Sequence, residues 1–496
     1  MKVLACGGLL LLAWWLRVQS LNGPRFHPDE ALFASYARAI AVWRDPLLQG
    51  VLVDKPPLLF YLQALCYPFL GPKEMAARLP SLVASTLTVA LCLALTKHLC
   101  RRVRECVTEE GADPPRETMG SLIAGVIVVL SPMAVAFSPT AFTDPLAVMW
   151  GTAAVLAAAS KRYGKAGLFL GLGMATKYQA GLFSLLVVPL LASDPDRGRR
   201  VTSCGGAGAW ARCAAGVLVP LSLVAGWDWA RSGRLSLLET QWLSYGGLRF
   251  AYSEDLWPRL VDWLRLGRWV VGAKSVGLIV VALGIAWIAS VAAGGRRRGS
   301  DGVGILLVFW LAAYGALHWL LEVPVWDRYL LPAVPVLAAL AGWLVARLLG
   351  TGTVTWILVG VFLISMLPSS LASAQGKLPL GGDHGTFDGM EQVASFFADQ
   401  PYGTVLYDHW LSWELYYYLF DSRVYISWFA DPEALIRDLT AFGANSPRYL
   451  VIPAWEDAEP ILRALDVAGF SALSALQAHR SDDSVAFLVW RIAGGT

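Results

Sequence analysis

The chain has 496 residues, of which 56% are hydrophobic and 16% are charged. This composition excludes an ordinary soluble protein and is typical of a protein that crosses the membrane many times. The net charge of +3 is too small to indicate nucleic-acid binding, and the seven scattered cysteines suggest neither a disulfide framework nor a zinc site.

Apolar stretches long enough to cross a bilayer recur along the first three quarters of the chain. A spanning helix needs ~20 mostly apolar residues, and this criterion predicts about eleven spans. In chain order they are 3–21, 79–97, 120–138, 142–160, 164–176, 179–192, 208–230, 269–293, 303–321, 330–349 and 353–371. We expect the first to be an uncleaved span rather than a signal peptide or a lipoprotein anchor.

Basic residues cluster in alternate loops between these spans. The clusters are Lys97, Arg101, Arg102, Arg104 and Arg116; Lys161, Arg162 and Lys165; Arg197, Arg199 and Arg200; and Arg296, Arg297 and Arg298. Cytoplasmic loops carry such an excess of Lys and Arg, so the pattern predicts a cytoplasmic N-terminus. The 22–78 loop, the 231–268 loop and the 374–496 tail then lie on the opposite, non-cytoplasmic face.

The 22–78 loop contains two charged motifs close to the membrane. They are His27-Pro28-Asp29-Glu30 and Asp54-Lys55-Pro56-Pro57-Leu58. Charge is costly so near a bilayer and therefore indicates a functional site. A carboxylate suits the removal of a proton, and an ammonium suits the binding of a phosphate. After the first motif, Leu32, Tyr36, Ile40 and Trp43 recur at helical spacing, which predicts an amphipathic helix in the interface plane.

The tail after the last predicted span is more polar. Short β-rich runs at 404–407, 423–428, 448–453 and 484–491 alternate with helical stretches at 387–399, 412–420, 431–442 and 456–468. This alternation predicts a small α/β domain. We therefore divide the chain into a transmembrane domain, 1–373, and a C-terminal domain, 374–496. The aromatic cluster between His409 and Tyr418 suits sugar stacking or, more simply, core and interface packing.

The order of the motifs resembles the dolichyl-phosphate-mannose protein mannosyltransferase superfamily, which includes the bacterial aminoarabinose transferases that act on lipid A. The matching segments are Pro28-Asp29-Glu30, the helix after it, Asp45-Pro46-Leu47-Leu48, the segment 54–61, Gly71 through Glu74, and Ala77 through Ser81. Weaker matches are Phe142 through Pro145, Ala175-Thr176-Lys177 and Asp327-Arg328-Tyr329. The resemblance covers roughly the first 340 residues.

The resemblance implies a polytopic α-helical membrane protein of the GT-C type, with interfacial helices in the first outer loop and a soluble C-terminal α/β domain. It also implies an inverting transfer of a monosaccharide from a polyprenyl-phosphate carrier to a hydroxyl acceptor, which could be a protein, a lipid or a glycan. The enzyme would lie among the lipids of the inner (plasma) membrane, with its site and C-terminal domain on the periplasmic or extracellular side.

The resemblance assigns the acidic residues to proton transfer. Asp29 would be the general base, because the acceptor hydroxyl must lose its proton as it attacks the anomeric carbon. Glu30 would orient Asp29 or contact the acceptor, and Asp144 would lie near the acceptor or the base. A simpler explanation remains open, since Asp29 and Asp144 stand where helices are predicted to begin and could cap them.

The basic residues are assigned to the donor phosphate, whose charge grows as it leaves. Lys55 is the first candidate, with Lys177 and Arg328 as further candidates for the same anion and Tyr329 beside it. Each cation also has an ordinary interpretation. Lys55 could be a solvated interface lysine, Lys177 could extend from a short helix towards water, and Arg328 could be an interfacial anchor.

Two further alternatives concern a metal and the class of protein. Asp29, Glu30 and Asp144 could together bind a divalent cation, but the first loop has no Asp-x-Asp motif, so we expect no catalytic metal and no other cofactor. Polar residues along a membrane cavity would also serve a transporter or a flippase for a lipid-linked sugar. A membrane-tethered glycan-binding module would place the function in the tail and leave the loop motifs unexplained.

Overall fold

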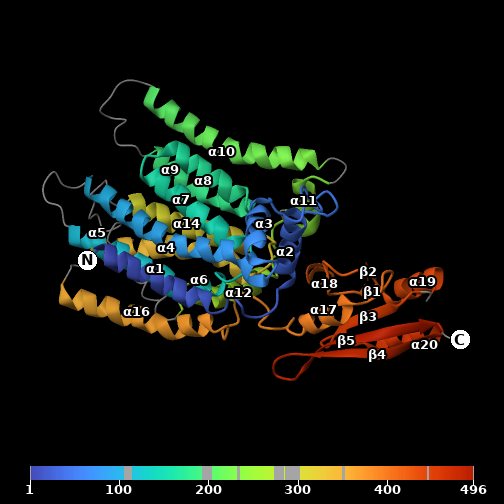
Figure 1. Cartoon of the computed structure of the whole chain (residues 1–496). Helices are drawn as coiled ribbons and strands as arrows, with labels where there is room; N and C mark the ends of the chain where they lie inside the picture. Colours follow the sequence, from blue (N-terminus) through green and yellow to red (C-terminus); the bar gives the residue numbers. More distant parts are fainter. Residues whose placement is uncertain are drawn as a thin grey trace.

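The computed structural model describes residues 2–105, 114–192, 204–231, 235–247, 249–272, 284, 302–348, 352–443 and 446–494. A helical part is followed by a smaller part that contains a sheet (Figure 1). The first helices are α1 (Lys2–Val18), α2 (Pro28–Ala41), α3 (Leu58–Leu70), α4 (Glu74–Glu105), α5 (Pro114–Leu130), α6 (Pro132–Ala136), α7 (Asp144–Ala159) and α8 (Tyr163–Met174). They are followed by η1 (Tyr178–Phe183), α9 (Ser184–Ala192), α10 (Cys204–Ala230), α11 (Leu237–Tyr245), α12 (Leu256–Val271), α14 (Gly302–Leu320), η3 (Asp327–Leu330), α15 (Ala333–Leu348) and α16 (Thr353–Ala374).

Four helical segments among the described residues are long and apolar enough to cross a membrane. They are Glu74–Arg101, Ala207–Ala230, Gly302–Leu320 and Asp327–Leu348. Shorter apolar helices lie at Leu4–Val18, Leu58–Leu70, Asp144–Ala159, Tyr178–Ala192 and Val359–Ala374. The chain therefore has the helices of a membrane protein, while the predicted number of about eleven spans stays a prediction. Most of the predicted 269–293 span lies outside the described residues.

The predicted 120–138 span differs from the structure, because the helix is interrupted. Helix α5 ends at Leu130, and the short helix α6 begins at Pro132 with Ser131 as its N-cap. The Ser131 side chain accepts a hydrogen bond from the backbone N–H of Ala134. Proline has no N–H to donate and clashes with the preceding turn, so it starts a helix more readily than it continues one.

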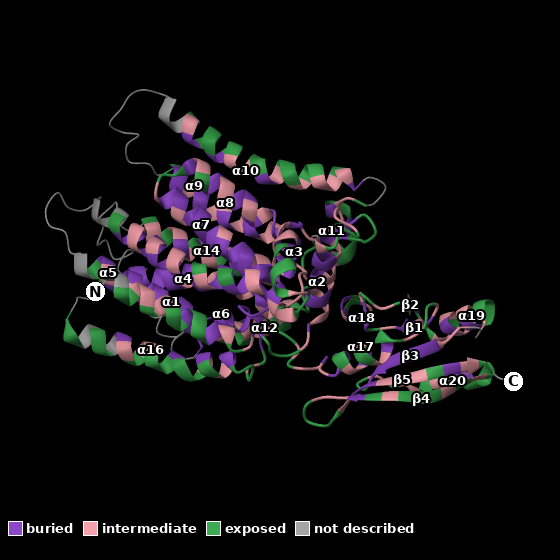
Figure 2. Cartoon of the chain, in the orientation of Figure 1, coloured by how far each residue is buried: buried purple, intermediate pink, exposed green. Residues whose placement is uncertain are grey.

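Small residues allow the central helices to approach closely. A Cβ added to Gly342 of α15 would lie 2.2 Å from the carbonyl oxygen of Gly120 in α5, and one added to Gly167 of α8 would lie 1.9 Å from that of Cys213 in α10. Such backbone contacts are how apolar helices gain packing energy inside a bilayer. Figure 2 shows the buried residues gathered in α4, α5 and α7, with α10 and α16 more exposed at the outside of the bundle.

The first long loop folds over one end of this bundle. Helix α2 is present as predicted, but its apolar residues Phe33, Tyr36 and Ile40 are buried, and Phe33 and Tyr36 pack on Phe60 of α3. Of the four residues in the predicted pattern, only Trp43, just after the helix, is largely exposed, at 81%. An amphipathic pattern reports only that one face is covered, and here protein rather than lipid covers much of it.

The C-terminal part contains a mixed five-stranded sheet with the strand order β2-β1-β3-β5-β4. Its strands are β1 (Val405–Asp408), β2 (Tyr425–Trp428), β3 (Arg448–Pro453), β4 (Phe470–His479) and β5 (Val485–Gly494). Its helices are α17 (Met390–Ala398), α18 (Ser412–Tyr418), α19 (Pro432–Phe442) and α20 (Glu459–Val467). Strands β1, β2 and β3 are parallel, while β4 and β5 form an antiparallel pair. The sequence did not predict β4, which is rich in Ala and Ser and half exposed.

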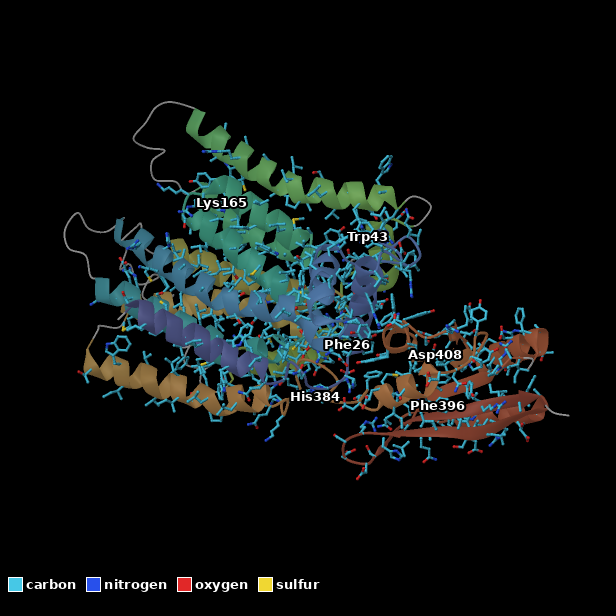
Figure 3. All side chains as sticks on the ribbon, viewed as in Figure 1. Phe26, Trp43, Lys165, His384, Phe396 and Asp408 are labelled. Carbon is cyan, nitrogen blue, oxygen red and sulfur yellow. The ribbon has the colours of Figure 1, made fainter. Side chains whose placement is uncertain are left out.

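Helix α18 joins the C-terminal part to the first loop. The Tyr417 ring meets Phe26 edge-on at 4.8 Å between centroids. The Tyr418 hydroxyl accepts a hydrogen bond from the Phe26 N–H at 3.2 Å and donates to Glu74 Oε1 at 3.0 Å. Arg38 of α2 donates to the Tyr417 carbonyl at 2.8 Å. Phe26 therefore lies where the two parts meet, as Figure 3 shows.

Candidate active site

A cavity of about 720 Å³ lies where the first loop, the 231–268 loop and the C-terminal part converge. Asp29 and Lys55 of the first loop line it, together with Tyr245 at the end of α11, Arg328 of η3 and Trp413 of α18. Three of the residues predicted from sequence, Asp29, Lys55 and Arg328, thus share one cavity. The others, Glu30, Asp144, Lys177 and Tyr329, do not line it.

The carboxylate of Asp29 is not used to cap its own helix. The N-cap of α2 is His27, whose Nδ1 accepts a hydrogen bond from the Asp29 N–H at 3.1 Å. The Glu30 carboxylate accepts in return from the His27 N–H at 3.2 Å, which completes a capping box. The Asp29 carboxylate is therefore left to face the cavity, where Arg328 Nη2 lies 2.7 Å from its Oδ2.

Glu30 is held in a separate, buried network. Its carboxylate accepts from Arg78 Nε at 3.1 Å, from Arg78 Nη2 at 3.2 Å and from the Ala141 N–H at 2.6 Å. The Glu30 and Arg78 side chains are only 4% and 3% exposed. Through these bonds Glu30 ties the start of α2 to α4 and to the turn before α7. Of its two predicted roles, orienting Asp29 fits this position, because the carboxylate does not reach the cavity.

Lys55 lies on the cavity wall beside two acceptors. Its Nζ donates to the Asp54 carboxylate and to the Tyr245 hydroxyl, the latter at 2.6 Å. Burial raises the pKa of Tyr245, and the nearby Asp54 and Asp29 carboxylates raise it further. The phenol therefore stays neutral at pH 7. Sequence reasoning missed Tyr245, because no motif surrounds it and it comes from a loop far along the chain.

Arg328 presents its guanidinium between aromatic rings. Its Cζ lies 4.7 Å from the centre of the Phe142 ring and 4.3 Å from that of Trp326. The two faces hold the planar group in place by cation–π attraction. A guanidinium held this way, and already paired with Asp29, has further N–H donors available for an anionic group in the cavity.

Asp144 and Lys177 form a buried pair behind Arg328. Lys177 Nζ lies 2.7 Å from Asp144 Oδ1 and 4.5 Å from the centre of the Tyr329 ring. Asp144 does not act as the N-cap of α7, because that position belongs to Thr143. Burial lowers the pKa of Lys177 to about 8; Asp144 opposes the shift, while Arg328 and Lys55 add to it. Tyr329 is fixed by its carbonyl, which accepts from the Tyr314 hydroxyl at 2.6 Å.

No cluster of three or more His, Cys, Asp or Glu side chains is arranged as a metal site within the described ranges. Asp29 is instead paired with Arg328, Glu30 with Arg78 and Asp144 with Lys177. The expected absence of a catalytic metal stays a prediction. What the geometry does provide is a carboxylate, an ammonium and a guanidinium on one cavity, which can accept a proton and hold an anion.

These elements make up a helical membrane protein with a C-terminal sheet domain, and solved structures share that fold. A crystal structure of ArnT from Cupriavidus metallidurans bound to undecaprenyl phosphate matches with a TM-score of 0.61 and 15% identity. The apo structure of the same protein matches with a TM-score of 0.62 and 14% identity. Each match covers 98% of this chain and 97% of the ArnT chain.

The chain therefore has the ArnT fold, which is of the GT-C class, and the resemblance seen in the motif order is confirmed at the level of fold. The likeness extends beyond the first 340 residues into the C-terminal domain. No protein-family model matches the chain, and no curated protein matches it either. Fold alone does not define an activity, so the activity must be argued from the cavity.

Proposed function

We propose that the protein is an inverting glycosyltransferase that moves a monosaccharide from a polyprenyl-phosphate carrier to a hydroxyl acceptor on the non-cytoplasmic side of the membrane. The observation that carries this proposal is the shared cavity of Asp29, Lys55 and Arg328. The neighbouring ArnT structure, which holds undecaprenyl phosphate, supports a polyprenyl-phosphate donor.

The reaction is a single displacement at the anomeric carbon. Asp29 accepts the proton of the acceptor hydroxyl, and the acceptor oxygen forms a bond to the anomeric carbon from the face opposite the phosphate. The bond between that carbon and the phosphate oxygen breaks, and its electron pair leaves with the phosphate. Lys55 and Arg328 stabilise the growing phosphate charge, and the sugar passes through an oxocarbenium-like transition state, as in glycoside hydrolysis.

The shape of the molecule supports the proposed orientation. In Figure 1 the N-terminus lies at the end of the helical bundle away from the sheet domain. Lys165, from one of the basic clusters, lies nearer that end, whereas Phe26 and Trp43 lie at the end beside the sheet domain (Figure 3). With the N-terminus in the cytoplasm of an inner (plasma) membrane, the cavity and the proposed 374–496 domain face the periplasm or the outside.

The proposal is tested by reconstituting the full chain in liposomes with a radiolabelled polyprenyl-phosphate sugar. Release of the polyprenyl phosphate, together with transfer of the label to a hydroxyl compound, is the expected result. Movement of the intact sugar-lipid between leaflets without cleavage would show a flippase instead and would refute the proposal.

Replacing Lys55 with Ala should weaken donor binding, because the substitution removes an ammonium from the wall that faces the phosphate. We expect the KM for the donor to rise about tenfold, since a charge-assisted hydrogen bond contributes about 1.5–3 kcal/mol. Initial rates over a range of donor concentrations measure this. Lys73→Ala is the matched control, because Lys73 is an exposed lysine of the same loop and does not line the cavity. An unchanged donor KM and kcat in Lys55→Ala would exclude the phosphate role.

The pH dependence should report on Lys177. The Lys177 ammonium predominates below its pKa of about 8 and loses its proton as the pH rises through that value. Asp144 is then left buried without its cation. We therefore expect kcat/KM to fall above about pH 8. In Lys177→Arg the guanidinium stays protonated, so the decline should move to higher pH or vanish. A decline at the same pH in both proteins would assign it to another group.

A further inference from the structure

The C-terminal part supplies its own section of the cavity wall. Trp413 of α18 and Gly382 of the loop before α17 line the cavity, alongside His27, Trp326 and Asp327. Lys55 and Tyr245, which face the proposed phosphate, come from the first loop and α11. In Figure 1, α11 and α18 lie on opposite sides of α2. The C-terminal part therefore adds its own residues, Gly382 and Trp413, to a cavity whose proposed phosphate-binding cations come from the first loop and η3.

Trp413 is placed on this wall by residues that follow it in the same helix. Leu415 and Tyr417 of α18 are buried, and Tyr417 and Tyr418 contact the first loop through Phe26. Trp413 itself is 43% exposed. Within the part of the chain that the structure describes, its ring pairs with no other aromatic ring and its indole N–H has no acceptor. An aromatic side chain that is held in place by its helix but left unpacked offers a flat face to a ligand.

Carboxyl groups lie close to Trp413 and Gly382 in the structure. Asp327 lines the cavity, and Asp383 follows the lining residue Gly382. Asp383 Oδ2 is buried and has no hydrogen-bond partner among the described residues. Burial raises the pKa of Asp383 to about 6, with Glu30 adding to the rise and His27 opposing it. The Asp327 carboxylate, which lines the cavity, can accept hydrogen bonds from hydroxyl groups.

A saccharide fits this combination. The C–H bonds on one face of a sugar ring carry partial positive charge and pack against the negative face of an indole ring. The hydroxyls at the edge of the sugar can donate to carboxylate oxygens. A lipid tail would have no use for the carboxyl groups.

Further exposed aromatic residues lie close to Trp413 in the chain or on the edge strand β2 of the same domain. Trp410 and Tyr416, three residues before and after it, are 38% and 52% exposed, and Trp428 on the edge strand β2 is 60% exposed. Trp428 is anchored by its indole N–H, which donates to the His409 carbonyl at 3.1 Å. An acceptor longer than one sugar therefore has more aromatic surface available beyond the cavity.

We propose that Trp413 is the platform for the acceptor, and that the acceptor is a saccharide whose hydroxyl is presented to Asp29. This inference rests on the proposed transferase function, because it names the acceptor class of the same site. It makes the C-terminal domain part of the substrate-binding site rather than an appended module.

The test measures binding without turnover, so that it does not depend on the transfer reaction. Maltotriose, a neutral soluble trisaccharide, is titrated into the full chain in detergent and followed by saturation-transfer NMR. We expect binding by the parent protein, an affinity at least about fivefold weaker in Trp413→Ala, and partial retention in Trp413→Phe. The matched control is Trp455→Ala, because Trp455 is 44% exposed in the same domain and does not line the cavity. The melting temperature of each of the four proteins is measured first, and affinities are compared only among proteins whose melting temperature equals that of the parent.

Two further arms identify the acceptor class and separate the two proposals. A threonine-containing hexapeptide and 1-dodecanol replace the trisaccharide, and binding of either one but not of maltotriose would overturn the saccharide assignment. Equal affinity of Trp413→Ala and the parent for maltotriose would overturn the role of Trp413. Polyprenyl phosphate release is measured separately. Its absence, with Trp413-dependent trisaccharide binding intact, would refute the transferase but leave the saccharide platform standing.

Discussion

Replacing Asp29 with Asn should lower the rate of sugar transfer by a factor of about 10²–10⁴, the usual contribution of a general base. The amide has the shape of the carboxylate but cannot accept the proton of the acceptor hydroxyl. The start of α2 should be undisturbed, because His27 rather than Asp29 caps it. The donor KM should change little, since Lys55 and Arg328 remain.

Single-turnover release of labelled polyprenyl phosphate measures this loss as a change in kcat. Asp255→Asn is the matched control, because Asp255 is exposed, makes no side-chain cap and lies outside the cavity. The two variants remove one carboxylate each from the same side of the molecule. If Asp29→Asn turned over as fast as Asp255→Asn, proton removal would belong to another group or to water.

Glu30→Gln should instead destabilise the protein by about 3–5 kcal/mol, the cost of removing one partner from a buried ion pair. The Arg78 guanidinium, with its side chain only 3% exposed, would lose its counter-charge in a setting that excludes water. The amide would also have a single oxygen where the carboxylate accepts from both Arg78 and the Ala141 N–H. Loss of transfer should accompany this destabilisation, because Asp29 would lose its orientation.

The midpoint of thermal unfolding, followed by intrinsic fluorescence in detergent, measures the effect. Glu459→Gln is the control, because the Arg463–Glu459 pair is 71% exposed on both sides and should contribute about 1 kcal/mol or less. Equal midpoints for the two variants would contradict the structural role of Glu30. A Glu30→Gln protein of normal stability that had lost transfer would favour the other predicted role, in which Glu30 contacts the acceptor.

The candidate site residues of the first loop were identified from the sequence alone. The motif around Asp29, the helix after it and the motif around Lys55 were recognisable as a set, and the ArnT structures confirm the predicted resemblance at the level of fold, while the number of spans stays a prediction. In the tail, α18 and α19 lie close to the predicted 412–420 and 431–442. These features depend on local spacing and periodicity, which a sequence displays directly. The roles assigned to the residues stay predictions.

The sequence was less informative where a local pattern has more than one structural outcome. The apolar face of α2 is covered in large part by α3, while its place in the interface plane stays a prediction. Pro132 divides a stretch that was predicted as one span. Strand β4 lacks the β-branched residues that mark strands. It is held by its ladder with β5, and that pairing is a tertiary fact.

The sequence alone determined the membrane class of this protein and the neighbourhood of its carboxylate and ammonium motifs, because composition and short-range order are properties of the chain itself. Only the tertiary structure decided which charges meet. It paired Asp29 with Arg328 and Glu30 with Arg78, and it brought Tyr245 and Trp413 to one cavity. Contacts between residues tens to hundreds of positions apart depend on how whole helices pack, and no local pattern encodes them.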